Sequence, residues 1–462
     1  MRHRFVDRAL ELRTLERVWR GEGPRLVIVY GRRRVGKTRL LKEFSRGKQT
    51  LFFVAIEAPK RVLYTELSKL VEELVGRPVG VLEGIDRVLE LVASEVERPL
   101  VIIDEFQYLV DADPEAPSRI QRFVDQRPEA DVMIVLCGSA VSFFERELLG
   151  YRSPLFGRRA AAVRLRPMRL VEAWGFYPRY GALDAVRVYS AFGGTPAYAS
   201  AVDDSISVVS NIARSILDPS SYLFHEAIDF LRQELREPST YVAILSAVAR
   251  GYTRPSEVAS IASVSQKTVS KYIDVLEHLD ILERLRSMGR RRGEVQLEII
   301  DPYFRFWFTF VKPHLSHLEA GLVEDVASIV SESLDEYTAR VFETVVRREL
   351  APYIARELGI ELGEVGKWWH KGEEIDVVIR GRRQAAFIEV KWSDLDRVEL
   401  ARIARDLEGK ASSSGLQRSE NTYIVVARRI EGCSPLCVEK PYAGVSAEGF
   451  LEKLRIEAQP HA

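Results

Sequence analysis

Near the N-terminus, the chain reads GRRRVGKT, a spacing of glycine, lysine and threonine that could hold phosphate groups. The glycines would let the backbone wrap around phosphates and point its N–H groups at them. The lysine would add a positive charge at the β- and γ-phosphates, and the threonine hydroxyl would bind Mg²⁺. A chance match in a glycine- and arginine-rich turn is the alternative. The pattern predicts a phosphate-binding loop (P-loop) for ATP and Mg²⁺, formed by Gly31, Arg32, Arg33, Arg34, Val35, Gly36, Lys37, Thr38 and Arg39.

Carboxylates that could complete this site follow an apolar run, in LVIIDEFQ. Asp104 ends the run, where an unpaired charge would be costly, and holding the Mg²⁺ shell would compensate that cost. Glu105 could polarise the attacking water, which gives it and Lys37 the expected catalytic roles. A solvated or capping carboxylate pair is the alternative. Ser139, just after the apolar run of VMIVLCGSA, could contact the γ-phosphate or cap a helix.

A second candidate site lies in EEIDVVIRGRRQAAFIEVKW, which reads as two strands joined by a turn. Strand side chains alternate between faces, so Asp376 shares a face with Glu374, and Glu389 shares one with Lys391. Two carboxylates can hold Mg²⁺ with waters and phosphate oxygens, and a lysine can help deprotonate an attacking water. If the registers agree, Asp376, Glu389 and Lys391 converge as a metal-dependent nuclease site, and Glu343 on a preceding helix adds a metal ligand. A surface hairpin with ordinary salt bridges is the alternative.

The elements that must position the P-loop are continuous apolar runs separated by amphipathic segments such as 62–74. Such runs are typical of buried parallel strands, and their alternation with helices predicts a parallel α/β sheet. The expected strands are 25–30, 51–55, 100–103, 132–137 and 161–165.

The middle of the chain changes to helical periodicity over 169–235. The segment 241–285 then reads as helix, short helix, helix and strand, with Ser265 as an N-cap, and the basic run after it reads as a turn between two strands. This order predicts a helix-turn-helix with a wing, whose basic residues could contact DNA phosphates. A winged helix used only for packing against protein is the alternative. The expected nucleic-acid contacts are Lys267, Lys271, Arg290, Arg291 and Arg292.

The composition bounds the remaining possibilities. Lys and Arg together number 67, as do Asp and Glu, so DNA binding would depend on local basic patches rather than on net charge. No apolar run is long enough to span a membrane, and we expect a cytoplasmic protein. Cys433 and Cys437 lack partners at zinc-finger spacing, and a disulfide between them would be unusual in a cytoplasm outside hyperthermophiles.

The motifs FVDRALEL, GRRRVGKT, LVIIDEFQ, LCGSA, SPLFGRR and FGGTP, in this order, resemble those of the archaeal P-loop ATPase family related to AAA+ and STAND NTPases. The resemblance covers about the first 235 residues. It implies that Arg8 lies near the nucleotide, although Asp7 replaces the glycine of the family's hhGRxxE box. It also implies that Pro196 packs on the base and that Arg158 and Arg159 contact phosphate, in cis or from a neighbouring subunit. Surface salt bridges are the alternative for these two arginines.

The C-terminal pattern D-x₁₂-E-x-K, within the order helix, three strands, helix and strand, resembles the PD-(D/E)xK restriction-endonuclease-like superfamily. It is also similar to the uncharacterised C-terminal domain typical of the archaeal ATPase family. The resemblance implies phosphodiester cleavage at Asp376, Glu389 and Lys391. A nuclease-like fold without activity is the alternative.

We therefore expect an α/β multidomain protein that hydrolyses ATP, acts on DNA and carries a nuclease-like C-terminal domain. The alternatives are a STAND-type switch whose nucleotide state gates homo-oligomer assembly, and a DNA-binding regulator with an inactive C-terminal domain. ATP, ADP, Mg²⁺ and DNA are the expected ligands and partners, and no membrane contact is expected. The expected domains are a P-loop core (1–167), a helical lid (168–235), a winged helix (236–311), a helical linker (312–331) and the nuclease-like domain (332–462).

Overall fold

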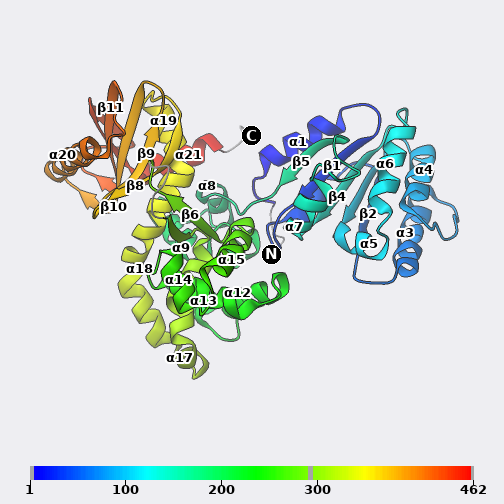
Figure 1. Ribbon diagram of the computed structural model, residues 1–462, viewed down its shortest axis with the longest axis horizontal. Coiled ribbons are helices and arrows are strands. Elements are labelled where there is room, and N and C mark those ends of the chain that lie inside the picture. Colours follow the sequence, from blue (N-terminus) through cyan, green and yellow to red (C-terminus); the bar gives the residue numbers. More distant parts are fainter. Residues whose placement is uncertain (1–4, 290–294, 459–462) are drawn as a thin grey trace. The chain divides into compact units, whose positions relative to one another are not determined.

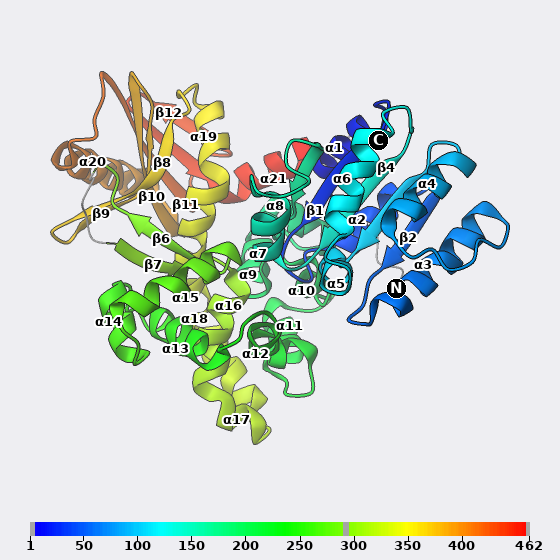
Figure 2. The same ribbon diagram turned by 45° about the vertical axis from the view of Figure 1, so that its right-hand side comes forward.

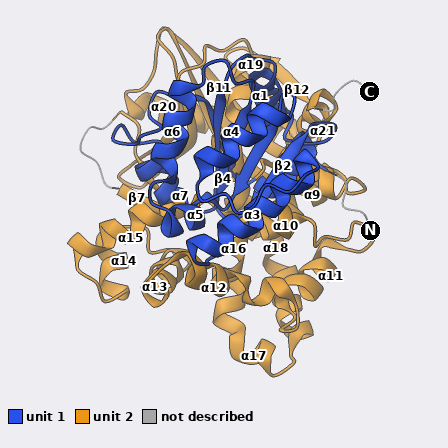
Figure 3. Ribbon diagram, turned by 90° about the vertical axis from the view of Figure 1, so that its right-hand side faces the viewer, with its two compact units in different colours: residues 1–167 blue, residues 168–462 orange. Residues whose placement is uncertain are grey.

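The computed structural model describes residues 5–289 and 295–458 and divides the chain into two compact units. Unit 1 comprises Met1–Pro167 and unit 2 comprises Met168–Ala462 (Figure 3). Within the described ranges, no helix has both the length and the apolar character needed to cross a membrane.

Unit 1 is built on a five-stranded sheet in which all neighbouring strands are parallel, in the order β2-β3-β4-β1-β5 (Figure 1). All residues of β1, β3 and β4 are buried, as expected for strands covered on both faces. The five strands predicted from apolar runs are confirmed to within two residues at each end. They are β1 (Arg25–Tyr30), β2 (Thr50–Val54), β3 (Leu100–Asp104), β4 (Met133–Gly138) and β5 (Arg159–Arg164).

Helices cover both faces of this sheet (Figure 2). Alternate residues of β1 point to opposite faces, so Val27 packs with α1 and α2 while Ile28 packs with α3 to α6. The sheet is therefore the middle layer of three. The helices are α1 (Ala9–Trp19), α2 (Lys37–Phe44), α3 (Lys60–Val75), α4 (Ile85–Glu95), α5 (Phe106–Ala112), α6 (Ala116–Gln126) and the short α7 (Val141–Phe143).

Unit 2 begins with a helical part, as the periodicity of this segment predicts. It continues into three helices and a two-stranded antiparallel sheet of β6 (Leu282–Arg286) and β7 (Val295–Ile299). Ser265 accepts a hydrogen bond from the backbone N–H of Thr268, which confirms its predicted role as an N-cap. The helices are α8 (Leu170–Ala173), α9 (Ala182–Phe192), α10 (Pro196–Ala199), α11 (Val208–Ile212), α12 (Tyr222–Glu234), α13 (Pro238–Ala249), α14 (Pro255–Ile261) and α15 (Gln266–His278).

An aromatic-rich segment and one long helix hold unit 2 together. The segment carries α16 (Pro302–Phe306) and α17 (Leu315–Glu319), and the aromatic residues within 301–310 are buried in the core. Helix α18 (Val323–Val345) then runs without a break through the domain boundary expected at 331/332. Apolar residues on one stripe of α18 belong to the same hydrophobic cluster as α9, α13 and strands of the C-terminal sheet. These parts of unit 2 therefore share one core.

The C-terminal part is a mixed six-stranded sheet in the order β12-β13-β11-β10-β9-β8. Strand β9 pairs antiparallel with β10, and β10 pairs parallel with β11 across helix α20. The predicted hairpin, helix and following strand are confirmed. Cys433 and Cys437 form a disulfide. The elements are α19 (Ala351–Glu357), β8 (Glu364–His370), β9 (Glu373–Arg380), β10 (Gln384–Leu395), α20 (Arg397–Ser414), β11 (Glu420–Ile430), β12 (Leu436–Glu439), β13 (Tyr442–Ser446) and α21 (Ala447–Ala458).

Candidate functional site

The P-loop joins the end of β1 to the start of α2, and its backbone depends on two glycines. A Cβ on Gly31 would lie 2.2 Å from the carbonyl oxygen of Leu165 on the neighbouring chain segment. Gly36 has φ 93°, a left-handed conformation that places the next N–H groups at the start of α2. Arg34 has φ 70°, which is uncommon for a residue with a side chain. Within the loop, Arg32 is buried, Arg33 and Arg34 are half-buried, and Arg39 on α2 is exposed.

Lys37 and Thr38, at the start of α2, have different hydrogen-bond partners. The ammonium of Lys37 donates hydrogen bonds to the carbonyl oxygens of Gly31 and Arg32, at 2.8 and 3.1 Å. The hydroxyl of Thr38 donates to Oδ2 of Asp104, at 2.6 Å. Asp104 is buried at the end of β3. A hydroxyl and a carboxylate placed together are the oxygen ligands that suit Mg²⁺, so these residues fit the ion.

Glu105 lies beside this pair and has its own set of donors. Its carboxylate accepts hydrogen bonds from the side chain of Gln107 (2.6 Å) and from the backbone N–H (3.2 Å) and hydroxyl (2.9 Å) of Ser139. Burial would raise the pKa of Glu105, but the hydrogen bonds from Gln107 and Ser139, together with the charge of Lys37, hold it below its ordinary value. The structure thus brings Ser139 to Glu105 because β3 and β4 are neighbours in the sheet. Gln107 was missed from sequence, although it follows directly in the DEFQ motif.

Arg8 reaches the P-loop from the segment that precedes α1. Its guanidinium donates to the carbonyl oxygens of Val35 (3.0 Å) and Arg166 (2.7 Å) and pairs with Glu11 (3.0 Å). Asp7 has φ 52°, so it adopts the left-handed conformation that a glycine would adopt more easily. Arg8 therefore stabilises the backbone of the P-loop by its hydrogen bond to Val35.

Two arginines expected at the phosphates are engaged elsewhere. Arg158 forms a two-pronged ion pair with Asp125, at 2.7 and 2.9 Å. Arg159 donates to the carbonyl oxygen of Leu149, at 3.1 Å. The structure thus gives both arginines local partners within unit 1. Pro196 belongs to unit 2, where it begins α10.

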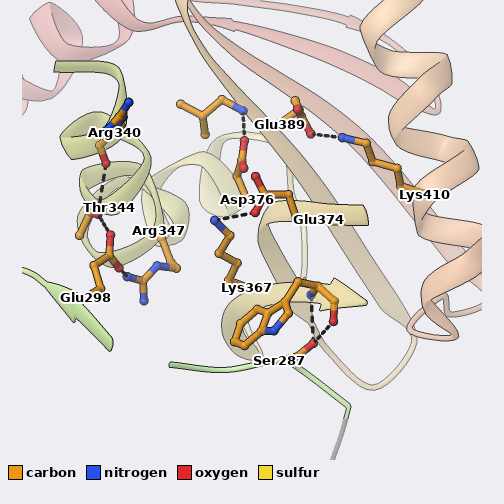
Figure 4. Close-up of polar contacts among 12 residues, drawn as sticks. Ser287, Glu298, Arg340, Thr344, Arg347, Lys367, Glu374, Asp376, Glu389 and Lys410 are labelled. Carbon is orange, nitrogen blue, oxygen red and sulfur yellow. Dashed lines mark hydrogen bonds and ion pairs between the residues drawn. The ribbon is translucent and has the colours of Figure 1, made fainter. Parts of the chain in front are cut away.

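The C-terminal candidate site forms where β9 and β10 run side by side. The pairing of Val377 with Ile388, continued by one residue, sets Asp376 directly opposite Glu389. The two residues are only 6% and 8% exposed. Oδ2 of Asp376 accepts a hydrogen bond from the backbone N–H of Val390, at 2.8 Å (Figure 4). Burial and the nearby charge of Glu389 raise the pKa of Asp376 above its ordinary value.

Two lysines hold the carboxylate of Glu389. Lys391 donates to Oε1 at 2.8 Å. Lys410 of α20 donates to Oε2 at 3.1 Å (Figure 4). Burial would lower the pKa of Lys391, but its hydrogen bond and ion pair with Glu389 raise it above its ordinary value. The structure therefore brings Asp376, Glu389 and Lys391 together, and it adds Lys410, which the sequence pattern did not indicate.

A third lysine, Lys367 of β8, enters the same cluster. It pairs with Glu374 at 3.1 Å (Figure 4). Burial would lower the pKa of Lys367, but the negative charges of Glu374, Glu343 and Asp376 raise it above its ordinary value. Burial, followed by the charge of Asp376, raises the pKa of Glu343 on α18. Lys367 was missed as a site residue because its contacts depend on the pairing of β8 with β9, which the sequence does not specify.

The expected three-carboxylate metal site does not form. Across residues 5–289 and 295–458, no three Asp, Glu, His or Cys side chains converge closely enough to hold a metal ion. Glu343 is close enough to influence Asp376 electrostatically but does not join Asp376 and Glu389 as a ligand set. Lysine ammonium groups from β8, β10 and α20 pair with carboxylates of this cluster instead. Asp376 and Glu389 alone fit a divalent cation whose other ligands are water or phosphate oxygens.

The expected nucleic-acid contacts divide between two elements. Lys267 and Lys271 are exposed on α15. Arg290, Arg291 and Arg292 lie outside the described residues.

The strands β6 and β7 that flank this segment are packed against the C-terminal part of unit 2 (Figure 4). Arg347 is 8% exposed and pairs with Glu283 of β6 and Glu298 of β7. Ser287 exchanges hydrogen bonds with the backbone of Trp369 in β8. This two-stranded sheet therefore makes protein contacts, whereas α15 leaves its lysines open to solvent.

An N-terminal and a C-terminal part of the chain each match a known protein family. Residues 5–202 match a family described as an ATPase domain predominantly from Archaea, and residues 307–403 match a family of archaeal and bacterial proteins of unknown function. An uncharacterised protein of Methanocaldococcus jannaschii is 28% identical over 435 residues, covering 92% of this chain and 96% of that protein. An uncharacterised ATP-binding protein of the same organism is 53% identical over 45 residues, covering 10% of this chain and 76% of that protein.

Solved structures with partial similarity include a Walker-type ATPase of Pyrococcus abyssi and the ORC2 protein of Aeropyrum pernix. The first has a TM-score of 0.49 and 19% identity and covers 66% of this chain and 96% of its own. The second has a TM-score of 0.40 and 15% identity and covers 70% of this chain and 93% of its own. The N-terminal part of the chain therefore combines P-loop geometry with a match to an ATPase domain found predominantly in Archaea.

Proposed function

We propose that the protein binds and hydrolyses ATP and couples this to action on DNA through unit 2. The observation that carries the first part is the hydrogen bond between Thr38 and Asp104, with Glu105 held by Ser139 beside it. Thr38 and Asp104 would hold Mg²⁺, which neutralises phosphate charge when bound. Lys37, released from the loop carbonyls, would bind the β- and γ-phosphates. Glu105, ionised because its pKa is lowered, would orient the attacking water and accept its proton.

For the C-terminal part we propose a nuclease-like function of the PD-(D/E)xK type. The convergence of Asp376, Glu389 and Lys391 on paired strands supports it, as does the order of three strands, helix and parallel strand. Asp376 and Glu389 would bind a divalent cation, which supplies Lewis-acid charge when present. Lys391 would orient the water that attacks a phosphodiester.

Contact with DNA is proposed for the module of α13, α14, α15 and the β6–β7 sheet, which we interpret as a winged helix. The exposed Lys267 and Lys271 on α15, the helix expected to lie in a groove, support this interpretation. The neighbouring Arg284 is paired with Asp274 and Glu277, so it would add little to phosphate contact.

One observation favours a second candidate, a C-terminal part that binds nucleic acid without cutting it. Both carboxylate oxygens of Glu389 are occupied by ammonium groups. Nucleotide-dependent assembly would then be the output of the ATPase. A change in oligomeric size with ATP, measured by light scattering, would support this candidate if no DNA is cleaved.

The deciding experiment incubates the full chain with single- and double-stranded DNA and Mg²⁺ or Mn²⁺, with and without ATP. Asp376→Ala is the test variant, and Asp406→Ala on the exposed face of α20 is the matched loss of a carboxylate. We expect cleavage by the wild-type protein and by Asp406→Ala, and none by Asp376→Ala. Cleavage that survives in Asp376→Ala would rule out this site, and absence of cleavage by the wild-type protein would favour the binding-only candidate.

A further inference from the structure

The carboxylate of Glu389 is buried and carries two ammonium groups, one on each oxygen. Lys391 pairs with Oε1 at 2.8 Å. Lys410 pairs with Oε2 at 3.1 Å (Figure 4). A divalent cation bound by Glu389 needs at least one of these oxygens. Because an ammonium and a metal ion at one oxygen repel each other, one lysine must give way.

The surroundings of the two lysines decide which one leaves. Lys391 lies on the same strand as Glu389 and also feels the charges of Asp376 and Glu343, so it keeps counter-charges when Glu389 is neutralised. Lys410 comes from α20, and Glu389 is the one carboxylate with which it forms an ion pair in the described part of the chain. Its side chain is 29% exposed and that of Lys391 is 41% exposed, so both can reach solvent and the counter-charges make the difference. Lys410 is therefore the lysine that would lose its counter-charge.

We propose that Lys410 and a divalent cation compete for Oε2 of Glu389, and that the displaced ammonium of Lys410 then binds a phosphate of a nucleic acid. This inference rests on the proposed function of the C-terminal site. It adds that the divalent cation binds first and the nucleic-acid phosphate second. Without metal, Lys410 neutralises the site from within. With metal, the same positive charge is offered to a phosphodiester, for which a flexible ammonium is a suitable point-charge ligand.

The first test is titration calorimetry of Mn²⁺ into the full chain, counting the binding that Asp376→Asn removes. We expect Lys410→Met to bind Mn²⁺ roughly fivefold more tightly than wild type, because a competing ion pair is gone. Lys410→Arg keeps the pair and should bind like wild type. Arg405→Ala, an exposed cation on the same helix, reports the effect of lost positive charge alone and should change the affinity little. Thermal unfolding checks that each variant is folded.

The second test measures binding of a fluorescent DNA oligonucleotide with and without Ca²⁺. In wild type, Ca²⁺ should strengthen binding several-fold, and Lys410→Met should lose this gain. Unchanged or weaker Mn²⁺ binding by Lys410→Met would overturn the competition while leaving the metal site intact. Tighter Mn²⁺ binding with an undiminished Ca²⁺ effect would overturn the phosphate role. No Mn²⁺ binding sensitive to Asp376→Asn, in either wild type or Lys410→Met, would overturn the proposed metal site and the inference together.

Discussion

The carboxylate of Glu105 accepts hydrogen bonds from both the backbone N–H and the hydroxyl of Ser139, at 3.2 and 2.9 Å. The two residues lie at the ends of adjacent parallel strands, β3 and β4, so the sheet itself sets their separation. The contact fixes the direction of the carboxylate and stabilises its charged form. A carboxylate that is held in one direction and kept ionised can orient an attacking water by accepting its hydrogen bond.

Ser139→Ala should therefore shift the pH profile of ATP hydrolysis. Removing the hydroxyl raises the pKa of Glu105. Because activity needs ionised Glu105, the acidic limb of the pH profile should move to higher pH. We also expect the rate constant to fall by about tenfold because the carboxylate is less well oriented. The measurement is kcat against pH, with Ser94→Ala, at the exposed end of α4, as the control. An unchanged acid limb would contradict the role of Ser139.

Lys37→Ala should abolish nucleotide turnover and leave the fold intact. Its ammonium hydrogen-bonds to carbonyl oxygens of its own loop, so we expect the sheet to form without it. Phosphate release measures turnover, and circular dichroism checks the fold. Lys42→Ala, an exposed lysine on the same helix, should hydrolyse ATP like wild type. Undiminished hydrolysis by Lys37→Ala would reject the P-loop as the ATP site.

Arg347→Ala should destabilise unit 2 by about 3 kcal/mol near neutral pH, since it leaves buried carboxylates undercompensated. Burial would raise the pKa of Glu298, but Arg347 and Arg305 hold it below its ordinary value. The ion pairs therefore stabilise the fold at neutral pH and are lost as pH falls through that pKa. The penalty of the variant should shrink on acidification, as measured by urea unfolding at several pH values. Arg340→Ala, an exposed neighbour on α18, should cost little.

Glu349→Gln should make the protein more stable at alkaline pH. Burial raises the pKa of Glu349 to about 7, although the N–H of Leu170 and the hydroxyl of Tyr189 donate to it. The folded state thus favours the protonated acid, and wild type loses stability as pH rises from the ordinary carboxyl pKa to about 7. Glutamine mimics the protonated acid, so the melting temperatures should agree below the ordinary carboxyl pKa of 4.5, diverge as the pH rises to about 7, and keep a constant difference above that pH. Parallel melting curves throughout would show that Glu349 does not titrate in this range.

The double change Lys267→Ala and Lys271→Ala should weaken DNA binding uniformly across sequences. Each lost phosphate contact lowers the slope of log affinity against log salt by about one, so the slope should fall by about two. Fluorescence anisotropy over a range of salt concentrations measures it. Arg232→Ala, an exposed arginine on α12, is the control. An unchanged slope would assign α15 to protein packing.

The sequence predicts those features that depend on local pattern. Buried strands such as β1 are continuous apolar runs, and the P-loop depends on glycines at fixed spacing, so both can be located without a structure. Features that depend on tertiary contacts could not be found in this way. Lys410 reaches Glu389 only because α20 folds back along β10. Arg158 was expected at a phosphate, but nothing local indicates that Asp125 on α6 is its partner.

The expected domain boundaries show the same limit. Residues 312–331 contain charged and helical stretches that suggest a connector, yet α18 starts within them and continues to Val345. The residues that contact α18, and not the composition of the helix, show that it belongs to the core of unit 2. The carboxylate of Asp335 accepts hydrogen bonds from Arg187 of α9, Arg428 of β11 and the indole N–H of Trp392.

Helix α18 also bears on how this chain can change over evolutionary time. Because the helix and its apolar stripe are shared by segments on either side of residue 331, exchanging the C-terminal segment alone would split a common core. Recombination at that point would leave two exposed apolar surfaces rather than two folded pieces. We therefore expect the stretch from residue 168 onward to be inherited as a single block, with diversity confined to surface positions such as the exposed face of α15.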